Sequence, residues 1–194
     1  MGHATRSMPL IHRFLERGNE VFLASDGRAL KLLESEFPQL ICLELPAYNI
    51  TYRSSNMILN MAVQMPRITY AALTEHRRIQ QWQKQYKFDM ILSDNRFGTF
   101  HPKVKSVFMS HQLNLPIDNP FFAWVGNLAN RFWMSRYNEI WVPDFEGENN
   151  ISGKLSHPSP FKNTKYLGVL TRFKNIDLIK KYKITIILSG PEPM

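Results

Sequence analysis

Residues 2–25 read GHATRSMPLIHRFLERGNEVFLAS, a helical pattern that leads directly into a short apolar run. Apolar side chains recur at helical spacing over residues 5–16, and Gly18 follows as a stop signal. Residues 20–25, EVFLAS, have the apolar composition of a strand. A helix followed at once by a strand is the repeating unit of α/β proteins, so this stretch predicts that class.

The same alternation continues along the chain. Helices are predicted over residues 29–37 and, with an amphipathic pattern, over residues 119–137. The predicted strands are nearly continuous in apolar residues, which is typical of a parallel sheet covered on both faces. We therefore predict one Rossmann-like parallel sheet with helices on both faces. Its strands are residues 20–25, 39–44, 88–93, 105–110 and 139–142, and further apolar runs follow at 165–170 and 183–188.

The long stretch from residue 55 to residue 86 is predicted as two helices. Pro66 has no backbone N–H and disfavours helical geometry at Met65, so we expect a break there. The second half contains EHRRIQQWQKQYK at residues 75–87, which is polar and basic. A charge run of this kind is typical of a solvated helix face, and no nucleic-acid-binding motif accompanies it.

The composition indicates a folded domain with an anionic partner. The chain has 194 residues, 44% of them hydrophobic, and a formal net charge of +8. An excess of positive charge favours phosphorylated ligands, membrane surfaces or nucleic acids as partners. Cys42 is the single cysteine, no apolar run is long enough to cross a membrane, and the start does not resemble a signal peptide. We expect a cytoplasmic protein of one domain, or of one domain with a piece of another.

Several familiar sites have no counterpart in the sequence. It contains no G-x-x-x-x-G-K-[ST] loop, no complete G-x-G-x-x-G, no G-x-S-x-G turn and no H-E-x-x-H pair. Its histidines do not recur at the close spacing of a local metal site, and no D-x-D pair occurs. We therefore predict no metal ion and no cofactor.

Polar residues close each predicted strand. The carboxyl ends of parallel strands meet at one edge of the sheet, where α/β proteins bind ligands. Each of these residues could equally start a turn or cap a helix, so only the set as a whole indicates a ligand site. The set consists of Ser25 and Asp26, residues 93–96, residues 110–112, and Pro143 with Asp144.

Seven stretches, in order, resemble one family of bacterial enzymes. They are GHATRSMPLIHRFLERGNEVFLASDGR, LPAYNI, ILSDNRFG, SHQLN, WVPDFE, SGKLSHP and LSGPEP. Together they resemble the GT-B glycosyltransferases of family 28, related to the enzyme that transfers N-acetylglucosamine from its UDP-linked form to lipid-linked peptidoglycan precursors. The resemblance implies two Rossmann-like domains that face each other across a cleft. Residues 1–170 would form the acceptor-side domain, and residues 171–194 the linker and first strand of the donor-side domain.

The resemblance also implies that the chain is truncated at both ends. In the family, the GHATR turn follows a first strand at the centre of the sheet, and LSGPEP is followed by the rest of the nucleotide-sugar domain. We therefore expect a missing central strand, and we expect residues 1–194 alone to be inactive as a transferase.

The resemblance, read with the strand ends, suggests roles for particular residues in metal-independent transfer of a sugar from a nucleotide diphosphate to an acceptor hydroxyl. His3 is the first candidate for the general base and His111 the second, because imidazole exchanges protons near neutral pH. Arg6 would pair with the negative charge of a phosphate group. The alternative for Arg6 is a solvated charge on the helix surface, and the alternative for His3 is an exposed residue in a frayed terminus. The expected substrate-binding residues are Gly2, Arg6, Asp94, Asn95, Arg96 and Gln112, and the expected donor-diphosphate residues are Ser189 and Gly190.

Two further questions stay open at this level. A non-catalytic module that binds anions or nucleic acid is the alternative function, supported only by the net charge and by residues 75–87. We do not expect nucleic acid as a partner of the transferase.

Residues 119–137, NPFFAWVGNLANRFWMSRY, are more apolar than one buried helix face requires, with Arg131 and Arg136 close by. This helix either packs in the core, the commoner outcome, or lies on an anionic membrane surface, as a lipid-linked acceptor would favour.

Overall fold

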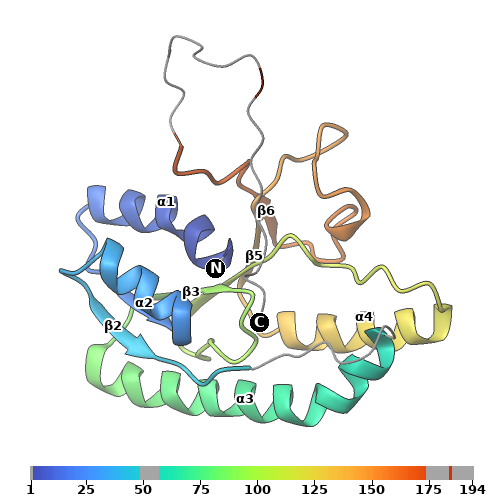
Figure 1. Ribbon diagram of the computed structural model, residues 1–194, viewed down its shortest axis with the longest axis horizontal. Helices are drawn as coiled ribbons and strands as arrows, with labels where there is room; N and C mark the ends of the chain where they lie inside the picture. Colours follow the sequence, from blue (N-terminus) through green and yellow to red (C-terminus); the bar gives the residue numbers. More distant parts are fainter. Residues whose placement is uncertain (1, 49–56, 174–183, 185–194) are drawn as a thin grey trace.

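The computed structural model describes residues 2–48, 57–173 and 184. In this part of the chain, helices alternate with strands, except that two pairs of successive strands have no α-helix between them (Figure 1). Every strand pair is parallel. The prediction of an α/β protein with a Rossmann-like arrangement is therefore confirmed.

The helices are α1 (Gly2–Glu16), α2 (Gly27–Glu36), α3 (Met57–Tyr86) and α4 (Pro120–Met134). The strands are β1 (Phe22–Ser25), β2 (Ile41–Glu44), β3 (Met90–Asp94), β4 (Lys105–Met109), β5 (Glu139–Val142) and β6 (Thr164–Tyr166), and a short 3₁₀ turn, η1, spans Gly153–Leu155. Strands β1 to β5 overlap the five predicted strands, and β6 overlaps the start of the predicted run 165–170. The predicted run 183–188 lies outside the described residues, apart from residue 184.

The strands form two parallel sheets and not the single predicted one. β1 pairs with β2, from Phe22 opposite Ile41 to Ser25 opposite Glu44. The second sheet has the order β3-β4-β5-β6. Among the described residues, no strand pairs with the edge of β1 that faces away from β2, or with the edge of β3 that faces away from β4. An apolar pattern identifies strands but not which backbone edges meet. The additional central strand expected from the resemblance stays a prediction.

Helices lie on both sides of the strands, as predicted (Figure 1). α3 and α4 lie on one side, where Ile79 packs with Ile91 of β3 and Met134 packs with Ile140 of β5. α1 and α2 lie on the other side and share a buried cluster with β1. This cluster consists of Ala4, Met8, Ile11, Leu23, Leu33 and Phe37.

α1 starts at Gly2, three residues before the predicted start at residue 5. The helix is amphipathic, and Met8 and Ile11 on its inner face are buried in the core. The earlier start places Gly2 and His3 in the first helical turn, where the backbone N–H groups have no helical partners. This turn is the part of α1 that reaches the candidate site described below.

α3 is a single helix of 30 residues, so the predicted break at Pro66 is wrong. A proline removes one helical hydrogen bond and crowds the preceding turn, but this loss is local. Ala71, Ala72 and Ile79 follow Pro66 and are buried, so the packing of the later turns maintains the helix. α3 bends toward its amino-terminal end (Figure 1), as expected of a helix with an internal proline.

α4 begins close to its predicted start. The Asn119 side-chain oxygen accepts hydrogen bonds from the backbone N–H groups of Phe121, at 3.1 Å, and Phe122, at 3.2 Å, which caps the helix. The helix ends at Met134, three residues before the predicted end at residue 137. Within the described residues, no helix combines the length and the apolar character needed to cross a membrane.

Candidate functional site

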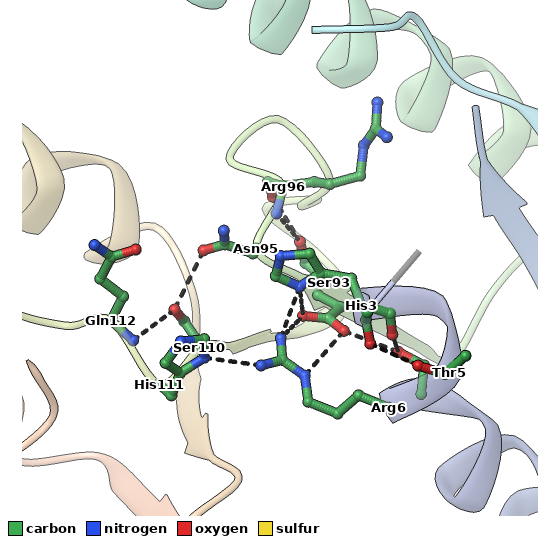
Figure 2. A network of polar contacts seen from close by, with 12 residues as sticks. His3, Thr5, Arg6, Ser93, Asn95, Arg96, Ser110, His111 and Gln112 are labelled. Atoms are coloured by element: carbon green, nitrogen blue, oxygen red, sulfur yellow. Dashed lines mark hydrogen bonds and ion pairs between the residues drawn. The ribbon is translucent and has the colours of Figure 1, made fainter. Parts of the chain in front are cut away.

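The candidate site lies where the first turns of α1 meet the carboxyl ends of β3 and β4 (Figure 2). Asp94 is the last residue of β3, and His111 follows β4 after one intervening residue. The fold brings these two residues together with His3 and Arg6 of α1, from three distant parts of the sequence. All four residues were candidates from the sequence.

The Asp94 carboxylate is the centre of this cluster. It accepts one hydrogen bond from Ser7 Oγ at 2.9 Å and two from Arg6, from Nε at 3.4 Å and from Nη2 in a closer contact. His3 Nδ1 lies 3.0 Å from Asp94 Oδ1. Ser7 was not among the predicted site residues. Its position four residues after His3 places Ser7 on the same helix face, and this spacing could have identified it as a site residue.

Asp94 and Arg6 form an ion pair that is mostly shielded from solvent. Their side chains are 14% and 16% exposed. Burial raises the pKa of Asp94, but the hydrogen bonds from His3 and Arg6 and the charge of Arg6 outweigh burial, so the pKa is lowered. Asp94 is therefore ionised at neutral pH and holds the start of α1 against the end of β3.

His3 has two partners that require opposite states of the same ring nitrogen. Its Nδ1 lies 3.0 Å from Asp94 Oδ1, which can only accept, and 2.9 Å from Arg6 Nη2, which can only donate. In one tautomer, Nδ1–H donates to Asp94 and Nε2 is free to accept a proton. In the other, Nδ1 accepts from Arg6 and Nε2 carries the hydrogen. The His3 side chain is 53% exposed, so a substrate can reach the ring.

His111 is held in a different state. Arg6 Nη1 lies 2.9 Å from His111 Nδ1, and a guanidinium group can only donate, so Nδ1 accepts and the neutral ring carries its hydrogen on Nε2. Burial lowers the pKa of His111, and the positive charge of Arg6 lowers it further. His111 therefore presents Nε2–H as a hydrogen-bond donor.

Hydrogen bonds connect the loops that follow β3 and β4. Asn95 has a φ of 58°, a left-handed conformation that asparagine adopts more readily than most residues. Its backbone N–H donates to the Met109 carbonyl at 3.0 Å, and its side-chain oxygen accepts from Ser110 Oγ at 3.2 Å. Ser110 Oγ also accepts from the Gln112 backbone N–H at 2.9 Å. Asn95 and Gln112 thus border the cluster, with the Gln112 side chain exposed.

Arg96 does not join this cluster, although the sequence placed it there. Its side chain points away from His3 and Arg6 (Figure 2). The guanidinium contacts Glu75 of α3 through Nε, Asp26 after β1 at 3.2 Å and the Pro46 carbonyl at 2.6 Å. These three partners hold the guanidinium inside the protein and give Arg96 a structural role, and its predicted contact with substrate stays a prediction.

Glu75 is the buried centre of this second cluster, and it was not among the predicted site residues. Its side chain is fully buried and accepts hydrogen bonds from Tyr48 Oη at 2.6 Å and the Gly98 backbone N–H at 3.1 Å, besides Arg96. Burial raises the pKa of both Glu75 and Tyr48, and the charge of Arg96 opposes this rise. In the sequence, Glu75 is the first residue of the basic stretch and looks like one more solvated charge.

Gly98 allows α3 to approach the loop after β3. A Cβ atom at this position would collide with the Ala72 carbonyl oxygen and lie 2.7 Å from the Cβ of Glu75. The close approach places Glu75 beside the backbone N–H of Gly98. Together, Glu75, Arg96 and Gly98 fix the loop that follows Asp94 at the candidate site.

The other strand-closing residues organise the backbone. Asp144 is buried, and its carboxylate accepts hydrogen bonds from the backbone N–H groups of Phe145, Ile151 and Ser152. Burial raises the pKa of Asp144, but a hydrogen bond from the Ser152 hydroxyl and these backbone hydrogen bonds outweigh burial and lower the pKa. After β1, the Ser25 carbonyl accepts from the Leu45 N–H at 2.8 Å. Asp144 and Ser25 therefore hold the backbone of the turns that follow β5 and β1, which is the alternative given above to a role in binding ligand.

The basic stretch at residues 75–87 is partly used for internal contacts. Besides the buried Glu75, Arg78 donates to the Glu44 carbonyl, and His76 stacks on Phe100 with 4.3 Å between ring centroids. These contacts engage Glu75, His76 and Arg78 within the protein, and the alternative of a module that binds anions or nucleic acid stays a prediction.

Gly2 is the remaining predicted residue that the structure describes. Gly2 is exposed at the first turn of α1, where free backbone N–H groups attract anions. Ser189 and Gly190 lie outside the described residues. Across residues 2–48 and 57–173, no group of three or more His, Cys, Asp or Glu side chains could hold a metal ion.

The fold and this site define a Rossmann-like α/β protein with a cluster of histidine, arginine and aspartate at the carboxyl edge of a parallel sheet. No protein-family model, no curated protein and no solved structure matches the chain. The chemistry of the cluster therefore carries the functional inference.

Proposed function

We propose that this protein takes part in transferring a sugar from a nucleotide-diphosphate donor to an acceptor hydroxyl, as a GT-B glycosyltransferase. The observation that carries the proposal is the 3.0 Å contact between His3 Nδ1 and the Asp94 carboxylate at the carboxyl edge of the sheet. The resemblance adds support, because three of its separate motifs meet here. GHATR contains His3 and Arg6, ILSDNRFG contains Asp94, and SHQLN contains His111.

The reaction needs a base for the acceptor proton. The acceptor oxygen attacks the anomeric carbon of the donor sugar and forms a new C–O bond. The bond from that carbon to the phosphate oxygen breaks, and the diphosphate leaves with the electron pair. The acceptor proton passes to His3 Nε2 while Nδ1–H stays bonded to Asp94, whose negative charge stabilises the imidazolium.

His111 has a different part in this proposal. Arg6 fixes the hydrogen of neutral His111 on Nε2, so His111 donates a hydrogen bond to a substrate oxygen and is not a second base. Arg6 is a positioning residue that donates hydrogen bonds to Asp94 and to His111. Its charge is balanced by Asp94, so a direct role on the donor phosphate has less support than the sequence suggested.

The leaving diphosphate needs a positive environment. The free N–H groups in the first turn of α1, beginning at Gly2, offer one half of it. The resemblance assigns the other half to Ser189 and Gly190 in the donor-side domain. An electrostatic site of this kind needs no divalent ion, in keeping with the predicted metal-independent transfer.

The test is turnover in protein that includes the complete donor-side domain. A hydrolysis screen over UDP-linked and other nucleotide sugars first identifies the donor. His3→Ala is then expected to lower turnover about 10²- to 10⁴-fold, the usual contribution of a positioned base. Donor affinity should stay nearly unchanged, because the donor binds mainly across the cleft.

The matched control is His12→Ala, which removes a histidine of the same helix whose ring contacts Phe37 and not the cluster. This variant should retain turnover. Full activity in His3→Ala would remove the proposed base and overturn the proposal, and full activity in His111→Ala would remove the proposed hydrogen bond from His111 to the substrate.

A further inference from the structure

α4 carries its apolar side chains on the outside. Large hydrophobic residues usually line the buried face of a surface helix, with polar residues facing water. In α4, Asn130 and Met134 are the buried residues, while six large apolar side chains are between 43% and 64% exposed. The six are Phe121, Phe122, Trp124, Val125, Leu128 and Phe132.

Asparagines attach the inner face of α4 to the rest of the protein. Asn127 Oδ1 accepts from the Leu115 backbone N–H at 2.8 Å, and Asn130 Nδ2 donates to the Leu113 carbonyl at 3.0 Å. These bonds fix which side of the helix faces inward. The helix is therefore held in the orientation that exposes its aromatic side chains, and it cannot rotate them inward without losing both contacts.

The exposed residues form one stripe along the helix. Phe121, Val125, Leu128 and Phe132 follow one another at intervals of three or four residues, so they share one side of α4. Trp124 lies beside Leu128 on the same side, at the i and i+4 positions. A contiguous exposed apolar stripe is typical of a surface that binds another protein or a membrane.

The charges at the carboxyl-terminal end of the stripe are positive. Arg131 is exposed in the last turn of α4, and the Arg136 guanidinium lies over the Phe132 ring, 3.9 Å from its centroid. The helix contains no acidic residue. A second copy of this chain placed symmetrically on the stripe would bring the same positive groups together. An anionic lipid surface would instead accept the aromatic side chains and pair with the arginines.

We propose that α4 is a membrane-surface helix that lies in the headgroup region of an anionic bilayer, with the stripe of Phe121, Trp124, Val125, Leu128 and Phe132 inserted. The helix has 15 residues, which is too short to span a hydrocarbon core of about 30 Å, so it lies along the surface. This inference does not depend on the proposed transferase activity.

Binding to vesicles tests the proposal on the protein as it is. We expect the protein to sediment with vesicles of equal parts phosphatidylglycerol and phosphatidylcholine, and much less with phosphatidylcholine alone. Trp124→Ser and Phe132→Ser should each weaken binding about tenfold, because each removes the free energy gained by burying one aromatic side chain in the bilayer. Arg131→Gln should weaken it about fivefold, and added salt should weaken the binding of the unaltered protein.

The matched controls are Ile151→Ser and Phe173→Ser, which remove apolar side chains that are 74% and 77% exposed outside α4. These variants should bind vesicles as the unaltered protein does. Equal losses in the control and α4 variants, or no binding of the unaltered protein to the anionic vesicles, would overturn the proposal. A concentration-dependent dimer in sedimentation velocity that Trp124→Ser abolishes would also overturn it, because a second copy would then cover the stripe.

Discussion

Replacing Asp94 with asparagine tests whether the cluster is an ion pair that holds α1 against β3. Asparagine has nearly the same shape as aspartate but carries no charge. In Asp94→Asn, the Arg6 guanidinium, which is 16% exposed, loses its counter-ion. Ser7 and His3 lose the carboxylate that they contact at 2.9 Å and 3.0 Å.

The size of the effect follows from these contacts. A hydrogen bond to a charged group contributes about 1.5–3 kcal/mol, and removing one partner of a fully buried ion pair costs about 3–5 kcal/mol. Solvent reaches part of this pair and asparagine retains one acceptor, so we expect the free energy of unfolding to fall by about 2–4 kcal/mol at neutral pH. For a domain of this size, that loss lowers Tm by about 5–15 °C.

The assay is urea denaturation followed by circular dichroism, at neutral pH and at acid pH. The pKa of Asp94 is lowered from its ordinary 3.8 in the folded protein, so its contribution is present above that value and is lost as pH falls through the lower folded value. The difference between the parent protein and Asp94→Asn should therefore shrink below a pH of about 4.

Asp89→Asn is the matched control, since Asp89 is exposed one residue before β3. Its stability should change by no more than about 0.5 kcal/mol. Two results would refute the reasoning: equal losses in both variants, or an Asp94→Asn loss that is the same at acid and neutral pH.

Two other predictions concern the residues around the cluster. Gly98→Ala should lower the free energy of unfolding by about 2–3 kcal/mol in urea denaturation, because its Cβ meets the Ala72 carbonyl; Gly2→Ala, where a Cβ meets nothing within 4 Å, should show no such loss. Nitrogen-15 NMR of the imidazole groups should find neutral His111 protonated on Nε2, with a pKa below its ordinary 6.5 that rises in Arg6→Gln. An Nδ1–H form of His111, or an unchanged stability in Gly98→Ala, would contradict the contacts described here.

Local pattern was sufficient to predict the secondary structure in most places. Apolar runs identified strands β1 to β5, and the amphipathic pattern located α4 to within three residues at each end. These signals depend on the few residues around each position, and so they are readable from the sequence. The break predicted at Pro66 was wrong because the packing of later turns, which is not a local property, maintained the helix.

The candidate site was partly predictable for the same reason. Polar residues at strand ends identified Asp94 and His111, because parallel strands share one carboxyl edge whatever their order in the sheet. Their partners in the cluster are Arg6 and Ser7, a turn or two into α1, and nothing in the local sequence states that this helix lies beside β3.

Arg96 and Glu75 show the limit most clearly. The sequence pattern placed Arg96 in a cleft and Glu75 on a solvated helix face. In the structure they form an ion pair inside the protein, although they are 21 residues apart in the sequence. The outward orientation of α4 is decided in the same way, by hydrogen bonds from Asn127 and Asn130 to a loop. The sequence alone determined which segments are helices and strands, because that depends on side-chain period. The tertiary structure decided which charges pair and which faces stay exposed, because burial and pairing depend on groups brought together only by the folded chain.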